Sequence, residues 1–219
     1  MNLLAIDSAS SLLSVAVARG EKIEYGEFEA GMKQSEYVMN CIDEQMKISG
    51  LKPQELYGIV CMGGPGSFTG LRIGYSIAKA LALALDIPFA PIPTLDCIAY
   101  SPLPCCGLVI PVIQARKGSF FYSFFEGTER LTADTEAGID ELAKIISKKV
   151  KKGEKHTIKG PGAGLLYNAL PPNLKPEFKV SGQGGYAREL ISIAKNREIF
   201  HNDNTVYLYT GPDYKREGS

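Results

Sequence analysis

The chain has 219 residues, 45% hydrophobic and 22% charged, which is enough for one large domain or for two small lobes, each with its own core. This composition excludes a disordered or a fibrous protein. The 24 basic and 24 acidic residues give a formal net charge of zero, so the totals show no basic excess of the kind typical of proteins that grip a long nucleic acid alone.

The first half of the chain predicts an α/β unit that begins with three short-linked strands, an antiparallel meander. Gly50 is expected to end the first helix, and Thr94 to cap the last one. In chain order the expected elements are strands at 3–7, 11–20 and 22–30, a helix at 34–48, a short helix at 53–56, a strand at 57–64, a helix at 67–86, a strand at 87–93 and a helix from 94.

The stretch SPLPCCG at 101–107 breaks this pattern and marks the predicted boundary between an N-terminal lobe, 1–104, and a smaller C-terminal lobe, 105–219. Beyond it the sequence predicts strands at 107–115 and 119–127, a helix at 140–152, a strand at 155–160, a helix at 186–195 and an extended tail at 203–211. In both halves a Gly-Pro-Gly follows a strand, at 64–66 and at 160–162. This restart indicates a duplicated α/β unit, two lobes with a cleft between them, in an actin-like or RNase H-like architecture.

The positions of the cysteines, histidines and apolar residues indicate in which cellular compartment the protein works and whether it binds a metal. The number of cysteines is odd and no C-x-x-C pair occurs, which fits a reducing cytosol. The two histidines lie on separate segments, so we expect no metal site. The start of the chain lacks a signal peptide pattern, and the apolar segment 73–85 contains Lys79 and is shorter than the ~20 residues that span a bilayer. We therefore expect a cytoplasmic protein without a membrane contact.

The glycine-rich stretch GGPGSFTGLRIG at 63–74 suggests a phosphate-binding loop, and this reading fails on particular residues. A P-loop requires a lysine after its last glycine, and none follows here. The dinucleotide-binding pattern requires a third glycine where Thr69 stands. Anion binding at the start of the following helix, assisted by Ser67 and Thr69, remains a minor alternative.

Small residues recur at every fourth position from Gly66 to Ala82 and would form one stripe on the helix. Each helical glycine costs ~1 kcal/mol relative to alanine, so close approach of another backbone should offset the cost. That backbone belongs either to the chain itself, in a packing groove, or to a partner, and we take the partner as the hypothesis. A bulky residue at Gly70 or Gly74 would then abolish binding while the fold survives. The predicted interface comprises Gly66, Ser67, Phe68, Thr69, Gly70, Arg72, Ile73, Gly74 and Ala78.

The turn after the first strand, with Asp7, Ser8 and Ser10, is a candidate cleft or nucleotide contact. Actin-like and sugar-kinase-like ATPases have D-x-G-[ST] at the matching turn, whereas here Ala9 obstructs the approach of a phosphate. Asp7 as a turn or cap residue is the alternative. No G-x-S-x-G surrounds a serine, so we do not expect a hydrolase. We assign no catalytic residue to the chain.

The lysine cluster KKVKKGEK at 148–155 also has two readings. It is the solvated end of a helix, because cations favour helix C-termini, or it is a nucleic-acid contact.

Three stretches, LLAIDSASSLLSVAV, GGPGSFTGLRIG and AKALALALDIPFAPIPTLDCIA, closely resemble the TsaB (YeaZ) family. The resemblance covers most of the predicted N-terminal lobe, is weaker through IQARKGSFFYSFFEG, and is loose at NTVYLY. Many family members have His-Ser-Glu where this chain has Gln34-Ser35-Glu36, so a role of that histidine does not carry over.

The resemblance implies a two-lobed actin-like (ASKHA) fold and a non-catalytic subunit of the machinery that makes threonylcarbamoyladenosine in tRNA. The implied partners are the catalytic paralogue TsaD and the ATPase TsaE, with homodimers by a similar surface and with tRNA bound only through the complex. It implies no activity and no cofactor for the chain alone, and ATP in the complex. The alternative function is an independent ATPase or peptidase.

Overall fold

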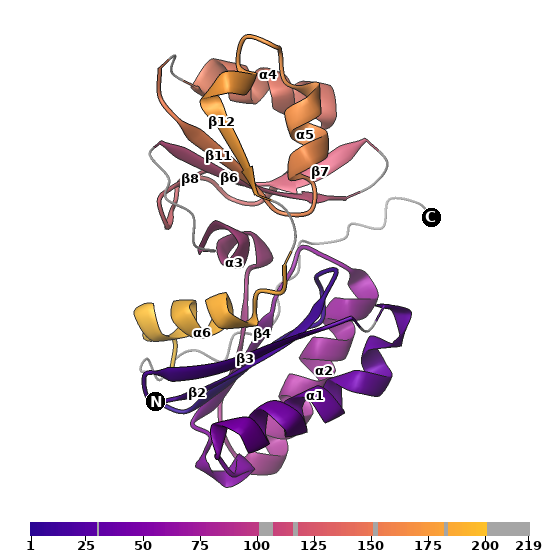
Figure 1. Cartoon of the computed structure of the whole chain (residues 1–219), viewed down its shortest axis with the longest axis vertical. Coiled ribbons are helices and arrows are strands. Elements are labelled where there is room, and N and C mark those ends of the chain that lie inside the picture. Colours follow the sequence, from indigo (N-terminus) through magenta and orange to yellow (C-terminus); the bar gives the residue numbers. More distant parts are fainter. Residues whose placement is uncertain (30, 101–106, 116–117, 151–152, 182–183, 201–219) are drawn as a thin grey trace, which may run out of the picture.

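The computed structural model describes residues 1–29, 31–100, 107–115, 118–150, 153–181 and 184–200. Two α/β lobes lie one above the other in Figure 1, with a short helix, α3 (Thr94–Tyr100), between them. The predicted boundary stretch at 101–107, except Gly107, and the predicted tail at 203–211 lie outside the described residues.

The first lobe contains a five-stranded sheet in the order β3-β2-β1-β4-β5. Strands β1, β2 and β3 pair antiparallel, which confirms the predicted meander, while β4 and β5 extend the sheet in parallel. The strand bounds are β1 Leu3–Asp7, β2 Leu13–Arg19, β3 Lys22–Phe28, β4 Gly58–Met62 and β5 Phe89–Ile92.

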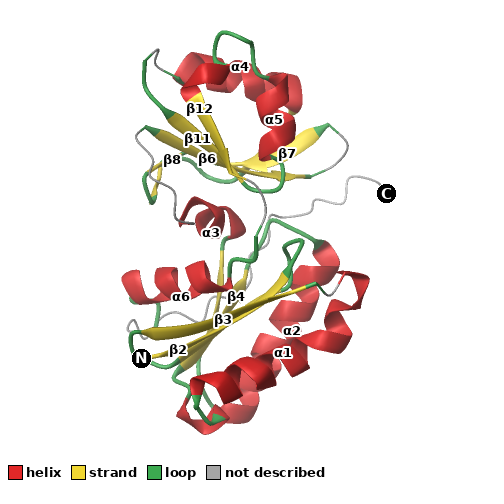
Figure 2. Ribbon diagram, viewed as in Figure 1, coloured by secondary structure: helices red, strands yellow, loops and turns green. Residues whose placement is uncertain are grey.

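Helices cover both faces of this sheet (Figure 2). Helices α1 (Gln34–Ser49) and α2 (Phe68–Leu85) cover one face, and α6 (Ala187–Asn196) covers the other. Successive side chains of a strand point to opposite faces, so Leu4 packs in the α1–α2 core and Leu3 in the α6 core. Short 3-10 helices run over Gly31–Lys33 and Pro53–Glu55.

The second lobe contains a sheet in the order β10-β7-β6-β11-β12, with a small β8–β9 hairpin beside β6. Helices α4 and α5 pack on one face of it. The bounds are β6 Leu108–Gln114, β7 Ser119–Tyr122, β8 Phe125–Glu126, β9 Glu129–Arg130, β10 Thr135–Gly138, α4 Ile139–Lys149, β11 His156–Lys159, α5 Ala163–Ala169, a 3-10 helix Lys175–Glu177 and β12 Phe178–Ser181.

The predicted single strand at 119–127 is interrupted in the structure. The Ser123 hydroxyl donates to the Thr132 carbonyl at 2.6 Å, and the Phe124 N–H donates to the Thr132 hydroxyl at 3.0 Å. These bonds to a neighbouring segment replace the ladder, so β7 ends at Tyr122 and β8 begins at Phe125.

Helix α6 follows the second lobe in sequence and packs on the first sheet. Leu190 and Ile191 are fully buried there, in one cluster with residues of β1, β2 and β4. The predicted division into 1–104 and 105–219 stays a prediction, since 101–106 are outside the described residues, but α6 contributes to the core of the first lobe.

Candidate functional site

The glycine-rich stretch forms the turn from β4 into α2. Gly64 has φ of +97°, which glycine alone adopts readily, and the Gly64–Pro65 peptide bond is cis. Ser67 caps the helix, because its hydroxyl accepts the N–H of Gly70 at 3.2 Å. The turn is tied to the next segment by the Thr94 N–H, which donates to the Gly64 carbonyl at 2.8 Å.

The small-residue stripe of α2 packs against the chain itself. Gly70, Gly74, Ala78 and Ala82 are the buried residues of the helix. A Cβ atom on Gly70 would lie 2.0 Å from the Ser8 carbonyl oxygen, and one on Gly74 would lie 2.7 Å from the Ser8 hydroxyl. The reading as an intrachain groove is therefore confirmed.

Two expectations change with this packing. Gly70, Gly74 and Ala78 are covered by their own lobe and offer no surface to a partner. The expectation that the fold survives a bulky residue at Gly70 or Gly74 is wrong, because the side chain would collide with the loop after β1.

The opposite side of α2 is open. Phe68 is 63% exposed and Leu83 is 82% exposed. Their spacing places them in one row with three other exposed residues, and we call this row the outer face of α2: Phe68, Arg72, Ser76, Lys79 and Leu83. The Arg72 guanidinium lies 3.8 Å from the centre of the Phe68 ring, a cation–π contact. Of the other predicted interface residues, Thr69 and Ser67 are exposed, and Ile73 is half-buried in the core beneath α1 and α2.

By length and composition, α2 would be able to cross a membrane, a criterion that a core helix of a soluble protein also meets. It is longer, at 18 residues, than the apolar segment 73–85 noted in the sequence. The buried stripe packs against its own lobe, whereas the outer face carries two large apolar side chains that are open to solvent.

Asp7 is fully buried at the end of β1, and both of its carboxylate oxygens have partners. Oδ1 accepts the N–H groups of Ala9 at 3.0 Å and Ser10 at 3.1 Å. Oδ2 accepts the N–H of Tyr186, which directly precedes α6, at 2.9 Å. Burial raises the pKa of Asp7 above its usual range, against the opposing effect of these hydrogen bonds. Of the two predicted roles, a nucleotide contact or a turn residue, Asp7 therefore has the role of a turn residue. It also holds the start of α6.

Of the two neighbouring candidates, Ser8 is buried like Asp7, whereas Ser10 is half-buried. Ser8 is buried, and its hydroxyl donates to the Gly70 carbonyl at 2.7 Å, which ties β1 to α2. Ser10 is half-buried, and its carbonyl accepts from the Gln34 side chain at 3.5 Å. Of the three residues that the sequence proposed as a cleft or nucleotide contact, Asp7 and Ser8 are buried and serve the packing of the first lobe.

A pocket of about 350 Å³ lies between the lobes. From the first lobe it is lined by the cap of α2, and from the second by the end of β6, by β7 and by β10. The lining residues are Gly66, Ser67, Phe68, Ile113, Gln114, Ala115, Phe121 and Glu136. The pocket brings together residues from both of the halves that the sequence pattern predicts to be duplicated.

One cluster that the sequence did not predict connects the lobes. Asp96 on α3 is buried, and it accepts from Arg130 Nε at 2.9 Å and from Arg197 Nη1 at 2.8 Å. Arg130 belongs to the second lobe and also pairs with Asp134, whereas Arg197 follows α6. The three residues are far apart in sequence, so no local motif signals the cluster. Among the described residues, no group of three or more His, Cys, Asp or Glu side chains could hold a metal ion.

Residues 29–207 match the protein family described as TsaD: tRNA N6-adenosine threonylcarbamoyltransferase. A Bacillus subtilis protein named tRNA threonylcarbamoyladenosine biosynthesis protein TsaB is 33% identical over 128 residues, which cover 58% of this chain and 56% of the relative. The chain thus spans little more than half the length of that relative. A Buchnera aphidicola protein of the same name is 27% identical over 94% of this chain and 97% of its own.

The fold of the whole chain also has a solved counterpart. A Pseudomonas aeruginosa crystal structure, of a protein described as similar to the peptidase YeaZ, superimposes with a TM-score of 0.76. The superposition covers 92% of this chain and 93% of that one at 19% identity. The two sheets, the helices on their faces and this likeness agree with the predicted two-lobed actin-like architecture.

Proposed function

The chain belongs to the TsaD family, as a member of its TsaB (YeaZ) group, and on this premise we propose that it is a non-catalytic subunit in the synthesis of threonylcarbamoyladenosine in tRNA. In this function it binds a TsaD-like catalytic paralogue, and a TsaE-like ATPase completes the complex. Homodimers form through the same surface when the partner is absent.

The observation that carries this proposal is the outer face of α2. The buried side of α2 consists of small residues, so the helix sits close to its own sheet, while two of its large apolar residues, Phe68 and Leu83, face away from the core. Leu83, at 82% exposure, and Phe68, at 63%, are large side chains that water solvates poorly. A partner that covers them would gain about 25 cal/mol for each Å² of apolar area removed from water.

The interior of the lobe supports a role without catalysis. Both carboxylate oxygens of Asp7 accept backbone N–H groups, so this side chain is committed to the fold. That gives no support to the alternative of an independent ATPase or peptidase. The proposal includes ATP only in the complex, where the pocket between the lobes is one place for it to bind.

The test replaces Leu83 by aspartate and measures complex formation with the TsaD-like partner plus ATP by size-exclusion chromatography with light scattering. The matched control is Leu165→Asp, since Leu165 lies on α5 in the second lobe and is 49% exposed. We expect Leu83→Asp to lose co-elution at micromolar concentration, because burying the new carboxylate against an apolar partner surface is unfavourable. Leu165→Asp should co-elute as the native chain does.

Far-UV circular dichroism of both variants establishes that they are folded. Equal co-elution of the two variants would reject the outer face of α2 as the binding surface. Failure of the native chain to co-elute, or turnover of ATP by the isolated chain that Asp7→Ala abolishes, would reject the proposed function itself.

A further inference from the structure

The zero net charge of the chain conceals two regions of opposite charge. Residues 1–100 contain seven Lys and Arg against eleven Asp and Glu. Residues 142–180 contain nine lysines against two glutamates, and no arginine. A basic region therefore exists in the second lobe although the totals show none.

Topology gathers these lysines at one end of the second lobe. Strands β6, β11 and β12 are parallel neighbours, so they begin at the same edge of the sheet. Lys155 directly precedes β11, and Lys175 begins the 3-10 helix that leads into β12.

Helix α4 ends at the same edge. Lys149, its last residue, has its Nζ 5.0 Å from the centre of the Phe124 ring. Phe124 directly precedes β8, which pairs with the first residues of β6. We call Lys144, Lys148, Lys149, Lys155 and Lys175 the lysine surface.

Most of these ammonium groups are open to solvent and carry uncompensated charge. Within the described part of the chain, no carboxylate forms an ion pair with Lys144, Lys148 or Lys149, all of which are exposed. Lys155 is the exception, since its Nζ lies 3.4 Å from a Glu177 oxygen. Lys175 is held in place by the Asn168 carbonyl, which accepts from its Nζ at 3.1 Å.

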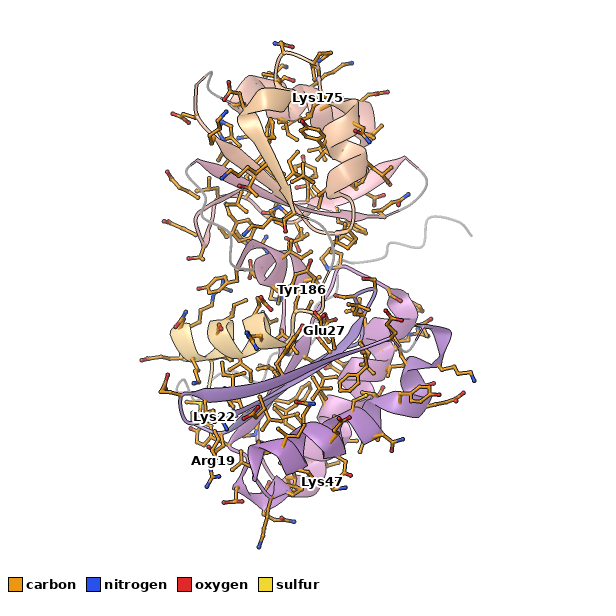
Figure 3. The ribbon with its side chains drawn as sticks, in the orientation of Figure 1. Arg19, Lys22, Glu27, Lys47, Lys175 and Tyr186 are labelled. Carbon is orange, nitrogen blue, oxygen red and sulfur yellow. The ribbon has the colours of Figure 1, made fainter. Side chains whose placement is uncertain are left out.

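Lysines of the first lobe differ, because some of them form ion pairs with neighbouring carboxylates. Lys22 pairs with Glu24 at 2.7 Å, and Lys47 pairs with Asp43 one helical turn away. In Figure 3, Lys175 lies at the end of the second lobe remote from the first, and Lys22 and Lys47 lie on the other lobe. A ligand on the lysine surface would therefore leave the first lobe free for a protein partner.

We propose that the lysine surface binds the phosphate backbone of RNA. This RNA is the tRNA substrate of the complex, an identification that rests on the proposed function. Lysine ammonium groups act as point charges that contact phosphates without reading sequence. The lysines are spread over the C-terminal half of α4, the residue before β11 and the start of a 3-10 helix. An interfacial membrane helix would instead present them along one amphipathic helix, so RNA is favoured over a lipid surface.

The test uses the complex with the TsaD-like partner and a fluorescently labelled tRNA, with anisotropy measured between about 50 and 200 mM NaCl. The variant Lys144→Gln/Lys148→Gln/Lys175→Gln removes three charges from two elements. The matched control, Lys22→Gln/Lys47→Gln/Lys52→Gln, removes three charges from exposed lysines of the first lobe. At about 0.7 per phosphate contact, the log–log salt slope should fall by about 2 for the lysine-surface variant, with a loss of affinity of about tenfold at low salt. The control should keep both values.

Each other outcome overturns the proposal. Equal losses in the two triple variants would mean that net charge alone sets the affinity. An unchanged salt slope in the lysine-surface variant would mean that the surface does not touch RNA. Loss of binding to phosphatidylserine vesicles, with tRNA binding intact, would assign the surface to a membrane.

Co-elution with the partner, measured on the same proteins, separates this inference from the proposed function. If the native chain fails to co-elute, the proposed function fails, and the RNA measurement is made on the isolated full chain at low salt. The lysine-surface variant must still lose RNA binding there relative to the control triple for the inference to stand.

Discussion

At the scale of single residues, the function of the glycines in α2 is set by one neighbour. The Ser8 carbonyl oxygen lies where a Cβ atom of Gly70 would be, and the Ser8 hydroxyl donates to the Gly70 carbonyl. Gly70 and Gly74 therefore let the helix approach the loop that follows β1. The ~1 kcal/mol that each glycine costs in a helix is offset by this packing.

Gly70→Ala should lower the free energy of unfolding by about 3 kcal/mol, because backbone, rather than a flexible side chain, blocks the new methyl group. Gly164→Ala is the matched control, since Gly164 is an exposed helical glycine and a Cβ atom added to it would meet no atom within 4 Å. The Gly164→Ala substitution should raise the free energy of unfolding by about 0.5–1 kcal/mol, because alanine is favoured over glycine in a helix. Urea unfolding followed by circular dichroism measures both. A stable Gly70→Ala variant would contradict the assigned packing.

At the scale of elements, α2 and α6 show how sequence order and packing differ. The fourfold spacing of small residues correctly predicted a stripe on α2, and the structure decided which backbone meets it. Helix α6 follows the second lobe, yet three N–H groups at its start are held by side chains of the first: Gly185 by Glu27, Tyr186 by Asp7 and Ala187 by Ser14. Two of these acceptors are carboxylates, which favour a helix N-terminus.

Leu190→Ala tests the place of α6. Because Leu190 is fully buried against the first sheet, its truncation should lower the free energy of unfolding by about 2–5 kcal/mol. Ile48→Ala, on α1, is the control, since Ile48 is 54% exposed and should change stability by less than about 0.5 kcal/mol. Chemical denaturation gives both values, and equal small effects would mean that α6 is not part of the first core.

At the scale of the whole molecule, Asp96 connects the lobes. It lies on α3 and accepts from Arg130 of the second lobe and from Arg197, which follows α6. Its carboxylate is 3% exposed, so little water screens these contacts. The short helix between the lobes is thus fixed from both sides.

Asp96→Asn should lower the free energy of unfolding by about 2 kcal/mol, because two arginines lose the charge that they share. Asp43→Asn is the control, since Asp43 pairs with Lys47 on the surface of α1 and its loss should cost only about 0.3–0.5 kcal/mol. Thermal unfolding of both variants, with hydrogen exchange of α3, checks this. If the two losses are equal, Asp96 does not stabilise the contact between the lobes.

Elements whose formation depends on interactions between residues close in sequence were predicted correctly. The meander, α1, α2 and the end of α1 at Gly50 were predicted, because apolar periodicity and capping residues act over a few positions. The β8–β9 hairpin, β10, α5 and β12 were missed, since these elements are two to seven residues long and leave little periodic signal.

The sequence by itself determined the two-lobed α/β architecture and the family, through local patterns and through the specific stretch at 63–74. Only the tertiary structure decided that the glycines of α2 face Ser8, that Asp7 holds the start of α6 and that Asp96 joins both lobes. These contacts join residues 34 to 179 positions apart, from the pair Asp96–Arg130 to the pair Asp7–Tyr186. Such contacts form only when the sheets have brought distant segments together, and no local rule of composition or spacing encodes them.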